Sequence, residues 1–319
     1  MSVTELPEWN GKRKGRALIV EGGGMRGAFT GGVLASMVVH HGPDNYDIVV
    51  AVSSGSCAAS YYVTETEMDP VLSTRFVMIW RNELYGSRLM SFRNWLKGRS
   101  FLNQDYLIDY LFGDKYRLKS ERLDEPETTP FYVVVSNLRT GRPEYHRGTS
   151  RNILPLLKAA TALPLATPGR RRLGKNMYTD GGVMDPVPLR AVINAGYRDI
   201  TMVLTNPRSF RTKAYGGMVG TLCYPFDPKA ARALTKIQHR RYNDAYEILN
   251  NPPPGIDMRV IDPAIPVPAG LLDTDVSLLN QSVDLGIDAG IRAFTRTRNG
   301  LRARLGNLWS RIRSRLAFS

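Results

Sequence analysis

Length, composition and charge exclude several classes of protein before any motif is considered. The chain has 319 residues, of which 43% are hydrophobic and 23% are charged. Ordinary globular proteins have this composition, so wholesale disorder and collagen-like or coiled-coil structures are excluded. The net charge of +14 indicates a polyanionic partner, either nucleic acid or an anionic membrane surface, or only a need for solubility.

Few residues are suited to hold a metal, a cofactor or a disulfide framework. Cys57 and Cys223 are far apart in the sequence and form no C-x-x-C pair. The four histidines are His40, His41, His146 and His239. Their spacing is not that of metal ligands, and no acidic loop resembles a calcium site. We therefore expect neither a metal nor a cofactor, and the sequence indicates no oligomeric state.

The hydrophobic segments are too short for a membrane protein. No apolar run reaches the ~18–20 residues of a transmembrane helix. The first 16 residues contain Glu5 and Glu8 and lack the apolar segment of a signal peptide. A cytoplasmic protein is the resulting expectation.

Short apolar strands alternate with helices along the chain. Strands are expected at 16–20, 47–52, 131–135, 178–180, 200–204 and 257–261. Helices are expected after Gly27, after Ser56, over 150–161, over 229–249 and from about 274, and residues 70–112 are helical and rich in aromatic residues. This order predicts one α/β domain with a mostly parallel sheet covered by helices. The domain is expected to span 16–290, between an extension (1–15) and a basic C-terminal segment (291–319).

A glycine-rich loop follows the first expected strand. Gly22, Gly23 and Gly24 allow backbone N–H groups to converge on a phosphate or an oxyanion at the start of a helix. Gly22, Gly24 and Gly27 also fit the spacing of a dinucleotide-binding fingerprint. The acidic residue which that fingerprint needs is not at the end of the second strand, and no G-K-[ST] follows. A tight turn without function is the remaining alternative.

A serine lies at the sharp turn after the second expected strand. Ala51, Ser53 and Gly55 match the G-x-S-x-G pattern of a nucleophile elbow, except that Ala51 replaces the first glycine. The small flanking residues leave room for an exposed serine side chain. The alternative is that Ser53, Ser54 and Ser56 only cap the following helix.

A serine nucleophile needs a proton acceptor, and no histidine lies at a predicted strand end. Asp180, followed by Gly181 and Gly182, does follow a predicted strand. An aspartate that acts directly on the serine is therefore the next candidate. An ordinary turn is the alternative for this motif.

These three motifs, in this order, resemble the patatin-like phospholipases. The segment 17–34 (ALIVEGGGMRGAFTGGVL) is similar to the bacterial branch of that family, and 160–164 (ATALP) and 180–188 (DGGVMDPVP) are similar to its second conserved block. The resemblance covers roughly residues 16–205. It implies a three-layer domain and a Ser–Asp dyad that hydrolyses lipid carboxylic esters, of the phospholipase A or lysophospholipase type, without a cofactor.

The resemblance also implies a role for each motif residue. Ser53 is the expected nucleophile, Asp180 the proton acceptor, and Gly22, Gly23 and Gly24 the oxyanion hole. Arg26 either braces the glycine loop or contacts a phosphate head group. The other residues of the motifs are Gly27, Ala51, Gly55, Gly181 and Gly182. Ala51 departs from the family pattern, so a catalytically impaired lipid-binding or membrane scaffold protein is the alternative.

The C-terminal segment is basic and amphipathic. From Ala289 onward it has eight arginines and no acidic residue, while its leucines, Ile312 and Trp309 recur at helical spacing. Such a helix suits the surface of an anionic membrane, with contacts from Arg302, Trp309, Arg311, Arg313 and Arg315. This predicts a peripheral membrane protein. Packing of the helix on the protein's own body is the alternative, and RNA binding ranks last because interleaved aromatic residues are few.

Overall fold

An eight-stranded mixed sheet forms the centre of the molecule. The computed structural model describes residues 5–11, 15–65, 75–96 and 100–295. The strands are β1 (Arg16–Val20), β2 (Ile48–Val52), β3 (Phe131–Asn137), β4 (Arg142–Arg147), β5 (Arg171–Leu173), β6 (Asn176–Asp180), β7 (Asp199–Val203) and β8 (Asp257–Ile261). Their order is β5-β6-β3-β2-β1-β7-β8, and β4 also pairs with β3.

The sheet is parallel over most of its width and antiparallel at one end. β3, β2, β1, β7 and β8 pair in parallel, as expected for strands joined by helices. The β3–β4, β3–β6 and β5–β6 pairs are antiparallel. The expectation of a mostly parallel α/β sheet is confirmed, and the mixed end, where two strands meet β3 from the opposite direction, is an addition to it.

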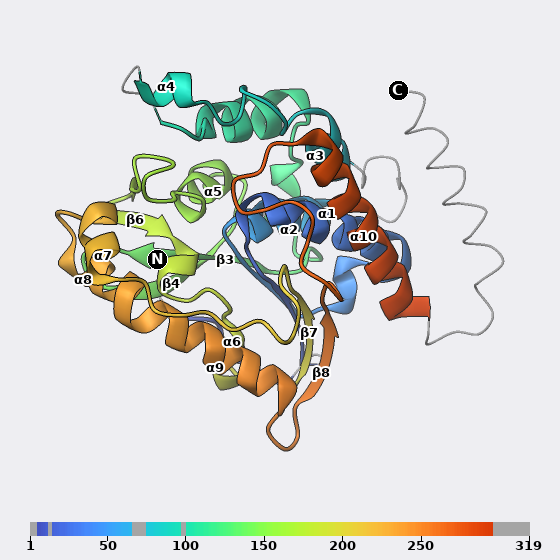
Figure 1. Ribbon diagram of the computed structural model, residues 1–319. Coiled ribbons are helices and arrows are strands. Elements are labelled where there is room, and N and C mark those ends of the chain that lie inside the picture. The colour runs from blue at the N-terminus through green and yellow to red at the C-terminus, as the bar shows by residue number, and fades with distance from the viewer. Residues whose placement is uncertain (1–4, 12–14, 66–74, 97–99, 296–319) are drawn as a thin grey trace.

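Helices cover both faces of the sheet (Figure 1). The principal helices are α1 (Gly27–His40), α2 (Ser54–Thr64), α3 (Arg75–Asn82), α4 (Phe92–Leu96), α5 (Ile153–Ala160), α6 (Leu189–Asn194), α7 (Gly217–Cys223), α8 (Pro228–Arg232), α9 (Gln238–Asn250) and α10 (Val276–Thr295). Leu18 and Val20 of β1 belong to the core under α1, α2 and α10, whereas Ala17 and Ile19 belong to the core under α6 and α9. Alternate residues of a strand point to opposite faces, so a strand covered on both sides is apolar throughout.

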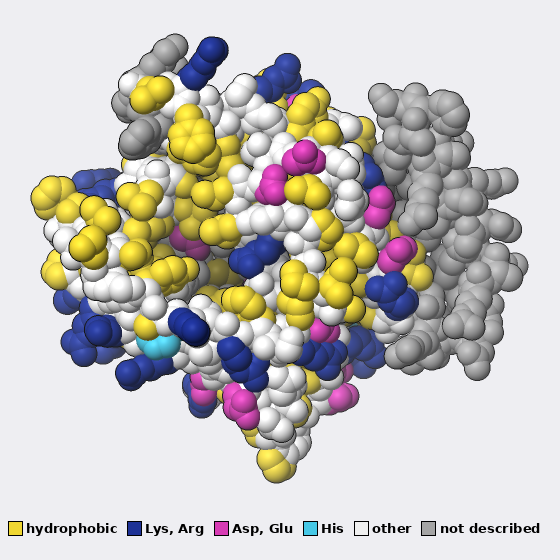
Figure 2. All heavy atoms as spheres, in the orientation of Figure 1, with side chains coloured by type: hydrophobic (Ala, Val, Ile, Leu, Met, Phe, Trp, Pro, Cys, Tyr) yellow, Lys and Arg dark blue, Asp and Glu magenta, His cyan; other side chains and the backbone are white. Residues whose placement is uncertain are grey.

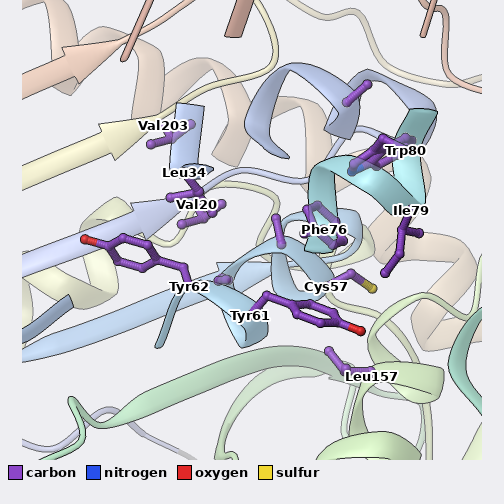
Figure 3. Packing of buried hydrophobic residues seen from close by; sticks show 14 of the residues in the cluster. Val20, Leu34, Cys57, Tyr61, Tyr62, Phe76, Ile79, Trp80, Leu157 and Val203 are labelled. Carbon is purple, nitrogen blue, oxygen red and sulfur yellow. The ribbon is translucent and has the colours of Figure 1, made fainter. Parts of the chain in front are cut away.

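Aromatic side chains fill the core between α2 and α3. Tyr61 of α2 and Phe76 of α3 lie with ring centroids 5.6 Å apart, and the Phe76 and Trp80 rings meet edge to face at 5.8 Å (Figure 3). Cys57 of α2 is buried in the same cluster. The segment 70–112 is thus helical only in part. Its described residues form α3, α4 and the beginning of a π-helix, Asp105–Lys115, joined by turns.

Two expected helix boundaries differ from the structure. The helix expected over 229–249 is divided into α8, a π-helical turn at Ala233–Ile237, and α9. α10 continues to Thr295, past residue 291 where a separate C-terminal helix was expected, and packs tightly on α1. A methyl group on Gly286 of α10 would lie 2.0 Å from the Phe29 carbonyl oxygen. Residues 296–319, which carry the membrane contacts expected at Arg302, Trp309, Arg311, Arg313 and Arg315, lie outside the described residues.

Candidate active site

The register of β3 brings the ends of β2 and β6 together. β4 occupies one edge of β3. On the other edge, β2 pairs up to Val52, opposite Val134, and β6 pairs in the opposite direction with Asp180 opposite Val135. β2 and β6 therefore run toward each other, end to end, along the same edge of β3. Ser53, the residue after Val52, consequently lies beside Asp180.

Ser53 and Asp180 form a hydrogen-bonded pair at this junction. Ser53 Oγ donates to Asp180 Oδ2 over 2.6 Å, and Asp180 Oδ1 accepts from the Gly182 amide over 2.7 Å. The bond from the Gly182 amide orients the carboxylate so that its other oxygen, Oδ2, faces the serine. A Cβ on Gly181 would lie 2.3 Å from the Val134 carbonyl oxygen. Glycine at 181 therefore lets the chain pass close over β3.

The backbone at Ser53 has the strained shape of an elbow. Its φ of 51° and ψ of −131° lie in a region that L-residues rarely adopt. β2 ends immediately before this residue and α2 begins immediately after it. The Ser53 side chain makes no capping hydrogen bond to α2 and instead donates to Asp180. The simple helix-capping alternative therefore does not describe Ser53.

Close packing of the glycine loop against the elbow explains where glycine is needed and where it is not. A Cβ on Gly22 would lie 2.6 Å from the Ser53 Cβ, and one on Gly55 would lie 2.5 Å from the Glu21 carbonyl oxygen. The Ala51 side chain instead belongs to the main core cluster and is fully buried in β2. The structure thus accommodates the departure from the G-x-S-x-G pattern at Ala51 inside a regular strand.

Burial makes Asp180 a stronger base than an ordinary aspartate. Loss of hydration raises the pKa of its carboxyl from 3.8 to about 6, against the opposing effects of the hydrogen bonds from Ser53 and the Gly182 amide. The group is ionised at neutral pH and has a higher proton affinity than an exposed carboxylate. This pKa lies closer to neutrality, which favours proton transfer from a substrate-facing hydroxyl.

The glycine loop offers amide donors beside Ser53. The three glycines 22–24 line the same hollow as Ser53 and Asp180. The Gly23 amide donates to Ser54 Oγ over 3.1 Å, whereas within the described part of the chain the amides of Gly22 and Gly24 have no acceptor. Gly24 adopts a φ of +57°, in the left-handed region that favours glycine. Two of the three expected oxyanion donors are therefore unoccupied, and the third is held by the neighbouring serine.

Glu21 supports this loop from beneath, and the sequence analysis assigned it no role. Its carboxylate is buried and accepts from the Thr205 amide over 2.6 Å and from Asn206 Nδ2 over 3.3 Å. The hydroxyls of Tyr242 and Tyr246 also donate to it. The same Thr205 donates through Oγ1 to the Gly22 carbonyl over 2.8 Å. Burial raises the pKa of Glu21 to about 7.

A signal for Glu21 does exist in the sequence. An ionisable side chain directly after four buried apolar residues must find partners, because an unpaired buried charge is costly. The partners come from the end of β7 and from α9, about 184 to 225 residues away along the chain. Their identity is not readable from local spacing.

Arg26 braces the glycine loop. Its Nε donates to the Gly23 carbonyl over 3.3 Å, and its NH1 group donates to Asn206 Oδ1 over 2.8 Å. Arg26 also lines the hollow in front of Ser53. Gly27 begins α1 where a Cβ would lie 2.9 Å from Ser54 Oγ, so the loop and the elbow are packed together at this point too.

Two hollows flank Ser53. One is almost entirely apolar and is lined by α2, α3 and the π-helix, with Phe76, Trp80 and Leu107 in its wall. The other is wider and more polar, and Arg26 and Gln238 line it. Ser53 lines both hollows. The arrangement can hold an apolar chain on one side of the serine and a polar group on the other.

Besides Ser53 and Asp180, the described residues that line the two hollows include Cys57 and Cys223, and burial raises the pKa of both thiols. Neither hollow is lined by a histidine. Across the described ranges, no three His, Cys, Asp or Glu side chains are grouped so that they could hold a metal ion. No helix of this described part is both long and apolar enough to cross a membrane.

Comparison with known proteins identifies the class. The family model "Patatin-like phospholipase" matches residues 18–193, more than half of the chain, so the chain belongs to the patatin-like phospholipase family. Membership implies, in general terms, a serine acyl hydrolase that acts on carboxylic esters.

Individual relatives are distant. The chain is 23% identical over 282 residues to the uncharacterized protein YjjU of Escherichia coli (strain K12). The aligned region covers 85% of this chain and 74% of YjjU. The crystal structure of VipD from Legionella pneumophila matches 92% of this chain and 70% of that chain, with 12% identity and a TM-score of 0.44.

Proposed function

We propose that the protein hydrolyses lipid carboxylic esters of the phospholipase A or lysophospholipase type through Ser53 and Asp180. The observation that carries this proposal is the 2.6 Å hydrogen bond from Ser53 Oγ to Asp180 Oδ2 in a strained strand-to-helix elbow. This bond directs the serine proton to a carboxylate whose pKa burial raises to about 6.

In the proposed acylation step, Ser53 Oγ attacks the ester carbonyl carbon while Asp180 accepts the hydroxyl proton. The electron pair of the carbonyl moves to its oxygen, which the free amides of Gly22 and Gly24 can stabilise. The C–O bond to the alcohol then breaks, and Asp180 returns the proton to the leaving alcohol. Ser53 is left as an acyl ester.

In the proposed deacylation step, water takes the place of the alcohol. Asp180 accepts a proton from water as the water oxygen attacks the acyl carbon, and the proton then passes to Ser53 Oγ as that bond breaks. A fatty acid leaves and the free enzyme returns. One carboxylate thus serves as base and acid in both halves of the reaction.

The two hollows support a lipid substrate. The apolar hollow beside Ser53 suits an acyl chain, because its walls are aliphatic and aromatic side chains. Arg26 lines the wider hollow, and its positive charge suits a phosphate-bearing head group. The basic C-terminal segment remains a separate proposal for contact with an anionic membrane.

Labelling with a fluorophosphonate tests the proposal. Intact-mass spectrometry should show one adduct on the wild type, none on Ser53→Ala, and one on Ser56→Ala, a matched control for a buried serine one helical turn away. Folding of each variant is checked by circular dichroism. Labelled protein is then compared with unlabelled protein for release of fatty acid from phospholipid, lysophospholipid, glyceride and thioester substrates.

The labelling experiment also distinguishes the alternative. Absence of any adduct on folded wild type, with and without anionic vesicles, would contradict an activated serine. The chain would then be a lipid-binding protein that has lost its activity, the alternative raised by Ala51.

A further inference from the structure

Apolar side chains on α7 are exposed to solvent to an unusual degree. Met218 is 78% exposed, Leu222 is 63% exposed, and Phe226, just beyond the helix, is 81% exposed. Met218 and Leu222 are one helical turn apart and so lie on one face of α7. Gly220, on another face, is buried against Thr235, and a Cβ there would lie 2.7 Å from Thr235 Cγ2. The helix is therefore anchored on one side and presents apolar residues on another.

The exposed side chains on α7 are continuous with the active-site mouth. Tyr215 and Val219 line the wider hollow together with Ser53. Leu271 and Leu272, in the loop between β8 and α10, line the same hollow and are 48% and 45% exposed. We call these residues, with Met218, Leu222 and Phe226, the apolar rim. Figure 2 shows apolar side chains gathered on this face around the hollow.

Basic residues border the α7 side of this rim. The segment 208–241 contains eight basic residues and one acidic residue. Three of the exposed basic residues, Lys229, Arg232 and Lys236, lie on α8 and the π-helical turn that pack against α7. Arg208 and Arg211 instead form ion pairs with Asp262 and Glu247. Figure 2 shows dark blue side chains beside the apolar ones. Asp273 and Asp275 follow Leu272 in the loop before α10, whereas the segment 213–236, which contains α7 and α8, has four basic residues and one acidic residue.

We propose that the apolar rim is the surface by which the protein docks on an anionic lipid membrane. Exposed apolar patches of this kind mark interaction sites. A combination of apolar side chains with a basic border suits a lipid interface, where each basic residue adds attraction to anionic head groups. Docking in this orientation sets the mouth of the hollow against the bilayer, so that a lipid can enter without crossing water.

The proposal concerns binding and goes beyond the proposed hydrolysis, so its test uses protein that cannot turn over lipid. The full chain carries Ser53→Ala together with Cys223→Ser and keeps the buried Cys57. In one version of this protein a reporter cysteine replaces Leu222. In a second version, the control, the reporter cysteine replaces Pro254, which lies in the exposed turn before β8. Because the strands are parallel, that turn lies at their amino ends, whereas Ser53 lies at their carboxyl ends on the opposite side of the sheet. Both cysteines receive an environment-sensitive dye.

Vesicles of phosphatidylglycerol and phosphatidylcholine provide the lipid surface. The dye at 222 should shift to shorter wavelength and be quenched by brominated acyl chains, whereas the dye at 254 should do neither. Replacing Met218 and Leu222 by serine in the unlabelled Ser53→Ala protein should weaken vesicle binding at least tenfold. The matched control, serine at Pro253 and Pro254, should leave it unchanged.

Three results would overturn the proposal. The first is vesicle binding that the Met218→Ser/Leu222→Ser variant retains. The second is a spectral shift at 254 with none at 222. The third is a dimer in sedimentation velocity that the double variant abolishes, because the rim would then bind a second copy. Absence of a fluorophosphonate adduct on the folded wild type would contradict only the proposed hydrolysis. The two proposals can therefore fail separately.

Discussion

Replacing Asp180 by asparagine should change activity and stability in opposite directions. The side chains have nearly the same shape, and the asparagine oxygen can still accept from the Gly182 amide. The amide nitrogen then faces Ser53 Oγ, which it can bond as a donor but from which it cannot take a proton. Removal of a general base typically lowers the rate by ~10²–10⁴-fold, and we expect a loss of this size.

The stability change follows from the pKa of Asp180. The pKa is raised by burial from 3.8 to about 6, so the folded state holds the proton more tightly than the unfolded state does. The contribution of this group to stability therefore falls as pH rises from about 4 to about 6 and is constant above that range. The cost of the ionised form is about 3 kcal/mol at pH 8 and about 1 kcal/mol at pH 4.5. The neutral asparagine avoids this cost.

Urea denaturation at these two pH values measures the difference. The free energy of unfolding of the Asp180→Asn variant should be about 2–3 kcal/mol higher than that of the wild type at pH 8. At pH 4.5 this advantage should be smaller by about 2 kcal/mol, and the m-values should be equal. Hydrolysis of p-nitrophenyl butyrate at pH 8 measures the activity. Asp185→Asn is the matched control, because Asp185 is also buried but bonds Tyr145 rather than Ser53, and its activity should stay within threefold of wild type.

Two outcomes would refute this reasoning. An Asp180→Asn variant with at least a tenth of wild-type activity would show that another group accepts the serine proton. A variant less stable than wild type at pH 8 would show that the buried carboxylate is stabilising as an ion, contrary to the cause assigned to its raised pKa.

Three further predictions concern the same site. Glu21→Gln should lower turnover of p-nitrophenyl butyrate at least tenfold while Ser53 still forms the fluorophosphonate adduct, because the carboxylate positions the oxyanion loop; unchanged turnover would remove that role. Ala51→Gly should destabilise the protein by about 1–2 kcal/mol, through loss of a buried methyl and greater freedom of the strand, with turnover within threefold; a tenfold gain would show that the methyl distorts the elbow. Leu107→Trp should narrow the apolar hollow and lower the ratio of long-chain to short-chain ester hydrolysis in parallel assays, and an unchanged ratio would place the acyl chain elsewhere.

Local signals were sufficient for most of the fold. The apolar runs that predicted strands at 16–20, 47–52 and 131–135 correspond to β1, β2 and β3, in which alternate residues are buried on two covered faces. The expected helix that follows the glycine loop is α1. The segment 70–112 was less predictable, since aromatic residues there form separate short helices whose packing partners, such as Tyr61, come from another part of the chain.

The sequence by itself determined the motifs, their order and the family to which they belong, because each motif is encoded by adjacent residues. Only the tertiary structure decided that Ser53 and Asp180, 127 residues apart, share a hydrogen bond, since that depends on β2 and β6 meeting along β3. It also decided the role of Glu21, whose partners come from β7 and α9, and the exposure of Met218 and Leu222. Hydrogen bonds and burial between distant segments depend on how the chain is packed, which local spacing does not specify.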